Sequence, residues 1–217
     1  MPAQNTSRSY GALARSLHWL TALLILANIP LGLIAERLPY DTSQALAQKA
    51  WLFSLHKTLG VAVLLLALAR IVSALLQPHP VPVHPDRRLE TFLAALVHWL
   101  LYICLVMLPL SGWVHHAALD GFAPILWPFG QGLPFVPKSE ALAALAGATH
   151  WLFSKLLIAT LALHILGAVK HALIDRDGVL ARMALGRPAG KPGARAPQRG
   201  PFYGAAAIFV AAGFGAV

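Results

Sequence analysis

The residues of this sequence best suited to chemistry are its histidines. The 217-residue chain has ten of them. An imidazole is a common ligand of transition metals. In an apolar environment it is costly to bury and is usually kept for a function. Six of the ten lie in or beside long apolar stretches and are the candidate site residues: His18, His56, His98, His150, His164 and His171.

Two of these histidines share one apolar stretch near the end of the chain. His150 and His164 are fourteen residues apart, which is ~21 Å along a helix axis and nearly four whole turns. Both imidazoles therefore project from the same face of the helix, one near the outer rim of a membrane and one near the inner rim. A single helix thus offers one imidazole at each of two depths.

Two more histidines match those depths from other helices. His18 begins the first apolar stretch and suits the depth of His164, whereas His56 begins the second and suits His150. A single buried histidine is more often a hydrogen-bonded packing residue than a ligand. Four that sort into two depth-matched pairs favour two bis-histidine haems. We predict that His18 and His164 bind the inner haem iron, and that His56 and His150 bind the outer one.

Residues beside the predicted ligands could help to hold the haems. Lys57 and Lys155 are candidate partners of the outer haem propionates, and Arg15 and Arg70 of the inner ones. The alternative is that the lysines extend to the membrane interface without touching a haem. Two small residues could let a flat macrocycle approach, or could serve only helix packing: Gly60 and Gly167.

His98 and His171 form a second group near the cytoplasmic ends of their helices. His171 lies seven residues beyond His164, hence on nearly the same face and ~10 Å deeper toward the cytoplasm. A histidine there could donate to a quinone carbonyl or relay a proton, or it could hydrogen-bond only to water. The other four histidines are expected in loops: His79, His84, His115 and His116.

The elements that position these residues are long apolar stretches. Apolar residues make up 58% of the chain and charged residues 12%, about half the usual charged share of a soluble domain. Each stretch approaches the ~20 residues that a membrane-spanning helix needs. We therefore predict an all-α membrane protein with a bundle of four transmembrane helices, over residues 17–34, 56–76, 92–114 and 149–173.

The basic residues predict how the bundle is oriented. Twelve lysines and arginines fall on one side and five on the other, and the side richer in them is cytoplasmic. Both ends of the four-helix unit are therefore expected in the cytoplasm. The net charge of +9 follows from this topology rather than from binding nucleic acid. The single cysteine, Cys104, excludes a disulfide within the chain.

The chain divides into four parts. We predict an N-terminal tail at 1–9, the four-helix di-haem domain at 10–185, a flexible basic linker at 186–201 and an apolar segment at 202–217. The last is short for a span and reads as a partial fifth helix, so we expect the natural chain to continue past Val217. In the long outer loop, Ser139 is expected to cap a short helix that runs through Gly147.

The sequence resembles the bacterial cytochrome b-561 family of small di-haem membrane proteins. The resemblance runs from about residue 10 to residue 185, and any one of its motifs is weak alone. The ordered set is specific: RSLHW from Arg15, HKTLG from His56, HWLLY from His98, PLSG from Pro109, then His150, His164, and Lys170-His171 followed by DRDG from Asp175.

The resemblance implies a four-helix bundle in the bacterial inner membrane with two b haems, held by the same two histidine pairs. One branch of the family, superoxide oxidase, takes electrons from superoxide at the outer face and passes them through both haems to ubiquinone. The quinone-site histidines of that branch fall here on His98 and His171. This chain departs from the branch because its outer loop has one lysine, Lys138, so a positive funnel for superoxide is not evident.

The expected function is electron transfer across the membrane between a periplasmic donor, with superoxide as one candidate, and quinone. The expected partners are membrane lipid and quinone, with no nucleic acid. Two alternatives stay open. The chain could be the haem-bearing membrane anchor of a larger oxidoreductase, or a transporter of a metal or small solute that uses the histidines directly. Transporters usually have internal repeats, and we find none.

Overall fold

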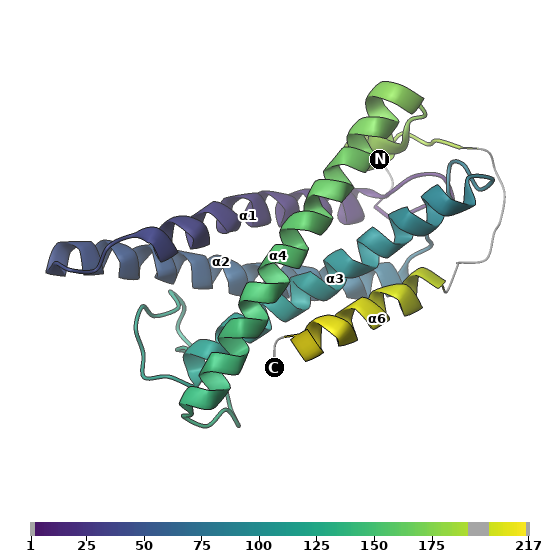
Figure 1. The fold of residues 1–217 in the computed structure, drawn as a ribbon. Coiled ribbons are helices and arrows are strands. Elements are labelled where there is room, and N and C mark those ends of the chain that lie inside the picture. Colours follow the sequence, from purple (N-terminus) through teal and green to yellow (C-terminus); the bar gives the residue numbers. More distant parts are fainter. Residues whose placement is uncertain (1–2, 191–199, 216–217) are drawn as a thin grey trace.

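Helices make up nearly all of the regular structure in the computed structural model, which describes residues 3–190 and 200–215. These ranges contain no strand. The four long helices are α1 (Ala12–Arg37), α2 (Ser43–Leu76), α3 (Arg88–Ala117) and α4 (Glu140–Lys170). They are followed by a π-helical turn, η1 (His171–Asp175), and by the shorter helices α5 (Val179–Ala184) and α6 (Gly200–Gly215) (Figure 1).

The four long helices are each long and apolar enough to cross a membrane, which confirms the predicted fold class. Large apolar side chains such as Leu23, Leu65 and Leu166 point outward and are 59–63% exposed. This is the arrangement that lipid requires, because hydrocarbon is as apolar as leucine. The inside of the bundle holds a small packed core around Cys104 and Phe153, so the lone cysteine is a packing residue.

The helices pack mainly as neighbours in sequence, α1 on α2, α2 on α3 and α3 on α4. In Figure 1, α4 crosses α3 obliquely and α6 lies alongside α3. The N-terminal tail and α5 meet at one end of the bundle, where Arg182 Nε donates to the Arg8 carbonyl at 2.8 Å and Nη1 donates to the Val81 carbonyl at 2.9 Å. We call this end the cytoplasmic side, after the distribution of basic residues.

All four long helices begin earlier than their apolar stretches indicate, and the difference is largest for α2 and α4. α2 begins at Ser43, capped by Thr42, because the residues before His56 are good helix formers although some are polar. Ser139 caps a helix as predicted, accepting from Leu142 N–H at 3.3 Å. The separate short helix through Gly147 was wrong, because α4 runs on without a break. One glycine inside a helix costs only about 1 kcal/mol.

The third helix also runs further than expected. α3 continues past Val114 to Ala117, so the assignment of His115 and His116 to a loop was wrong. Both imidazoles lie on the last turn of α3, with their ring centres 4.8 Å apart. They therefore face the outer end of the bundle interior instead of the loop that follows.

The apolar segment near the end of the chain forms α6, shorter than the four long helices and packed mainly on α3. Its Gly204 faces α3, where a Cβ would lie 3.3 Å from a methyl carbon of Leu96. The ring of Phe209 lies 5.9 Å from that of Phe153 on α4. The predicted linker at 186–201 falls largely on residues 191–199, outside the described part of the chain, so the division into domains stays a prediction.

Candidate functional site

The outer pair of histidines faces across the bundle from α2 and α4. The ring centres of His56 and His150 are 6.2 Å apart. Nδ1 of His56 lies 3.1 Å from the Asn28 carbonyl, and Nδ1 of His150 lies 2.9 Å from the Leu108 carbonyl. A carbonyl only accepts, so each Nδ1 carries the ring proton and each Nε2 keeps its lone pair. This is how proteins orient histidines for binding a metal.

Two glycines lie directly against the outer imidazoles. A Cβ on Gly32 of α1 would lie 2.7 Å from Cε1 of His56, and one on Gly112 of α3 would lie 3.0 Å from Nδ1 of His150. Neither position has room for a side chain unless a ring moves. The sequence did not predict either contact, although Gly112 belongs to the PLSG motif. Their signal is a glycine two or three residues after the proline within an apolar span (Pro30 and Pro109).

The two glycines chosen from sequence have other surroundings. A Cβ on Gly60 would make ordinary contact with Asn28 Nδ2 at 3.8 Å, and one on Gly167 would meet nothing within 4 Å. Neither glycine therefore lies against a histidine ring, unlike Gly32 and Gly112. Both sites have free space beside the backbone, as the prediction of a close-lying macrocycle requires, and that prediction stays untested.

A cavity of about 580 Å³ surrounds the outer pair. Besides His56 and His150, its lining includes Gly32, Gly112 and the pair His115 and His116. Asn28 also lines it, and its side-chain Oδ1 is buried with no hydrogen-bond partner among the described residues. A buried polar atom of this kind calls for a partner that the protein itself does not supply.

The inner pair lies near the cytoplasmic end of the bundle. The ring centres of His18 and His164 are 6.1 Å apart, and the ring of His98 lies 5.0 Å from that of His164. Nη2 of Arg70 is 3.4 Å from Nδ1 of His18. A guanidinium only donates, so in this contact Nδ1 of His18 accepts and cannot carry the ring proton itself. Binding of an iron at Nε2 of His18 would favour Arg70 turning to another acceptor.

Both ring separations fit one iron between two imidazoles. An imidazole nitrogen binds such a metal at about 2 Å and lies about 1 Å from its ring centre, so two rings on opposite sides of one iron have centres about 6 Å apart. The measured separations are 6.1 and 6.2 Å. The ring separations of both pairs therefore fit two bis-histidine haems, and the outer pair has in addition its two carbonyl partners and a cavity.

The candidate propionate contacts lie in different settings. Lys57 Nζ donates to the carbonyls of Phe122 and Ala123, at 2.7 and 2.5 Å, and so holds the outer loop over the cavity. Lys155 also lines the cavity, with its Nζ 5.4 Å from the centre of the Trp151 ring.

On the cytoplasmic side, the remaining two candidates are arginines. The Arg15 guanidinium lies against the backbone of Gly186, which has a φ of +69°. Arg70 stands between His18 and the ring of Tyr102, whose centre is 5.6 Å from the guanidinium carbon. Arg70 thus contacts a predicted ligand.

Replacing Lys57 with Met is expected to loosen the outer loop (residues 118–139). Methionine fills similar space but cannot donate, so the two loop carbonyls of Phe122 and Ala123 lose their partner at a cost of about 1–3 kcal/mol. Limited proteolysis should cut the loop faster in this variant than in wild type. Lys155→Met is the matched control, because its ammonium lies over a ring instead of on the loop. Equal cleavage rates in wild type and Lys57→Met would contradict this role.

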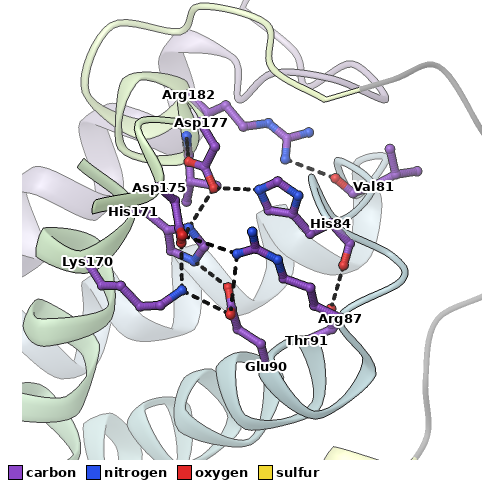
Figure 2. Close-up of polar contacts among 11 residues, drawn as sticks. Val81, His84, Arg87, Glu90, Thr91, Lys170, His171, Asp175, Asp177 and Arg182 are labelled. Atoms are coloured by element: carbon purple, nitrogen blue, oxygen red, sulfur yellow. Dashed lines mark hydrogen bonds and ion pairs between the residues drawn. The ribbon is translucent and has the colours of Figure 1, made fainter. Parts of the chain in front are cut away.

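The two candidate quinone residues, His98 and His171, have different neighbours. His98 lies beside His164, and its Nδ1 is 2.6 Å from the Ala94 carbonyl. His171 lies instead among charged groups at the cytoplasmic end of α4 (Figure 2). His98 therefore borders the inner pair, whereas His171 borders these charges.

We call those charged groups the cytoplasmic cluster: His84, Arg87, Glu90, Lys170, His171, Asp175 and Asp177. Lys170 Nζ lies 3.0 Å from a Glu90 oxygen and 2.6 Å from an Asp175 oxygen. Asp177 instead accepts from two imidazoles. Burial alone would raise the pKa of Asp177, but hydrogen bonds from Val179 N–H and the two imidazoles outweigh it, and the pKa lies below its ordinary value.

Comparison with known proteins gives consistent results. The family model described as prokaryotic cytochrome b561 matches residues 9–186. The chain is 26% identical to cytochrome b561 homolog 2 of Escherichia coli (strain K12) over 186 residues, covering 84% of this chain and 95% of the relative. It is 28% identical to the probable superoxide oxidase CybB of Yersinia pestis over 181 residues, covering 81% and 96%.

Proposed function

Because the chain belongs to the prokaryotic cytochrome b561 family, we propose that it carries electrons between a donor at the outer face and membrane quinone through two b haems. The family implies haem b and electron transfer at a membrane. The number of haems, the direction of electron flow and the partners are part of the proposal. The observation that carries it is the separation of 6.1 and 6.2 Å between the paired histidine rings.

A b haem with two histidine ligands exchanges single electrons and has no open coordination position for substrate. The protein's own residues supply the rest. His56 and His150 would hold the outer group with the tautomer set by the Asn28 and Leu108 carbonyls. His18 and His164 would hold the inner one. Lys57 has three ammonium protons, of which two go to loop carbonyls, so one is left for a propionate.

The quinone is proposed to bind beside the inner pair, between His98 and His171. Nδ1 of His98 points at the Ala94 carbonyl, which leaves Nε2 to accept a hydrogen bond from a quinol hydroxyl. His171 contacts Asp177, which lies between it and the cytoplasmic side, where protons for quinone reduction are available. The head group of the quinone would thus meet electrons on one side and protons on the other.

Superoxide is the first donor to test, because one relative is named a probable superoxide oxidase. The outer loop offers that anion little attraction. Its one lysine, Lys138, lies 3.4 Å from Asp120. A second candidate function, the haem-bearing anchor of a larger oxidoreductase, is favoured by aromatic side chains exposed on the same loop, where Phe129 is 79% exposed and Phe135 is fully exposed. Co-purification with a soluble subunit would distinguish the two.

Mixing the reduced protein with quinone tests the acceptor. The haem-loaded protein in lipid nanodiscs, reduced under argon, should be reoxidised when a short-chain ubiquinone is added. His98→Leu should slow this step by at least about tenfold, since it removes a group that contacts the quinone. His79→Gln, an exposed loop histidine, should behave like wild type. A reduced spectrum that persists in the presence of quinone would contradict the proposal.

A further inference from the structure

One carboxylate at the cytoplasmic end of the bundle joins two histidines. Oδ2 of Asp177 lies 2.9 Å from Nε2 of His84 and 2.7 Å from Nδ1 of His171 (Figure 2). We propose that His84, Asp177 and His171 form a proton relay that leads from the cytoplasmic surface to the quinone site. This inference rests on the proposed reduction of quinone, which consumes two protons for each quinol formed.

The fold holds the outer end of the relay in place although it lies on a loop. His84 belongs to the proline-rich connection between α2 and α3. Within that connection Val81 is fixed on both sides, since its N–H donates to the Ser7 carbonyl at 2.9 Å and its own carbonyl accepts from Arg182 Nη1 at 2.9 Å. The imidazole of His84 is therefore presented to Asp177 by contacts made elsewhere in its loop.

The middle of the relay is built by the way α4 ends. The helix widens into the π-helical turn η1 and then reverses through Arg176 (φ +50°) and Gly178 (φ +80°). Turns of this kind often occur at functional sites. The reversal directs Asp177 back over the helix end, where its Oδ1 accepts from Val179 N–H at 3.0 Å. Its Oδ2 is left for the two imidazoles.

The other carboxylates of the cytoplasmic cluster pair mainly with Lys170 and Arg87, although Asp175 and Glu90 also approach His171, at 3.3 and 3.4 Å. Lys170 bridges Glu90 and Asp175, and Arg87 lies 3.2 Å from Asp175 and 3.7 Å from Glu90. Asp177 differs from these carboxylates, because its hydrogen-bond partners within the described part of the chain are one backbone amide and two histidines. Among the carboxylates of the cluster, Asp177 is therefore the one that joins two imidazoles, and an imidazole can accept a proton at one ring nitrogen and release one from the other.

Exposure is highest at the outer end of the relay and lowest at its middle. The His84 side chain is 29% exposed, whereas Asp177 is 6% and His171 is 16% exposed. His84 can therefore exchange protons with water, and Asp177 is shielded from it. Because the surroundings of Asp177 favour its ionised form, a proton stays on this carboxylate only in transit.

The proton transfers balance at each group. Nδ1 of His84 takes a proton from water while Nε2 gives its proton to Asp177 Oδ2. His171 first rotates, so that its bare nitrogen faces Asp177 and its N–H faces the quinone. Asp177 then passes the proton to that bare nitrogen while the N–H on the other side releases its proton toward the quinone. Each group gains one proton and loses one, and rotation of the His84 ring restores the starting arrangement of N–H groups. Two such cycles complete one quinol.

A competing route would bypass His84. Glu90 Oε1 lies 3.4 Å from Nε2 of His171, and the Glu90 side chain is 33% exposed. Protons could then reach His171 from Glu90 directly. The two routes make opposite predictions for Glu90→Gln and His84→Gln, because glutamine keeps the shape and can hydrogen-bond but cannot carry a proton.

The relay is tested by the rate at which ubiquinone reoxidises the reduced, haem-loaded protein in nanodiscs. His84→Gln and Asp177→Asn should each lower this rate by at least about tenfold and raise its solvent deuterium isotope effect, with haem content and reduced spectrum unchanged. His79→Gln is the matched control, since His79 belongs to the same loop and lies outside the cluster. Imidazole added to the buffer should restore the rate of His84→Ala, which a purely structural role would not allow.

Three outcomes would overturn the relay. A wild-type rate in His84→Gln together with a slow Glu90→Gln would assign proton delivery to the direct route. A slow His84→Ala that imidazole does not rescue would make His84 a structural residue. Wild-type protein that ubiquinone fails to reoxidise would overturn the proposed function, and the relay with it. In the first two outcomes the wild-type protein still reduces quinone, so the two failures are distinguishable.

Discussion

Replacing His150 with Ala is expected to reduce the haem content from two haems b per chain to one. His150 and His56 face each other with ring centres 6.2 Å apart, and alanine removes one of the two iron ligands of the outer haem. The inner pair lies almost four helical turns away along α4, so it should keep its haem. A pyridine haemochrome assay against protein concentration measures the change, and a redox titration should lose one of two waves.

A control variant and a rescue experiment accompany the His150→Ala test. His79→Ala removes an exposed histidine and should leave two haems. His150→Gly opens space for an added imidazole, which should restore the second haem if the only loss is the ligand. Retention of both haems by His150→Ala would contradict the proposed pairing.

Replacing Gly32 with Val is expected to remove most of the outer haem without touching a ligand. A Cβ at this position would lie 2.7 Å from Cε1 of His56, so the ring must move away from the Asn28 carbonyl that orients it. Overpacking of this kind costs about 1–3 kcal/mol, and it falls directly on the geometry of the ligand. The inner haem should remain, so the haem count should approach one per chain.

The control for Gly32→Val is a glycine with free space. Gly132 lies in the outer loop, where a Cβ would meet nothing within 4 Å, and Gly132→Ala should keep both haems. Electron paramagnetic resonance of the oxidised protein reports the orientation of the outer ligands separately from the haem count. A Gly32→Val protein with two haems and unchanged resonance signals would show that the close contact has no role in ligation.

The spans and the histidine pairs were accessible from sequence because both depend on distance along a helix axis. Apolar length predicts a crossing, and the spacing of His150 and His164 fixes two depths. The structure brings the matching histidines to within 6.1 and 6.2 Å. Their role as ligands stays a prediction.

The parts that sequence could not supply depend on how each helix is rotated and where it ends. Gly32, and not Gly60, lies against His56. This contact depends on how α1 is rotated about its axis, which cannot be predicted from the depth of a residue in the membrane. His115 was misplaced because the apolar stretch ends before the helix does. The contact of His84 with Asp177 joins residues 93 apart through a loop and a π-helical turn, neither of which has a periodic signal.

The most direct test of electron transfer through two haems is a reduced-minus-oxidised absorption spectrum of the purified protein, combined with a pyridine haemochrome count. We predict the spectrum of a low-spin haem b and two haems per chain. A well-folded protein that binds no haem, although made with ample haem supply, would contradict the proposed electron transfer and favour a transporter that uses the histidines directly. One haem per chain would contradict the pairing of four histidines around two irons.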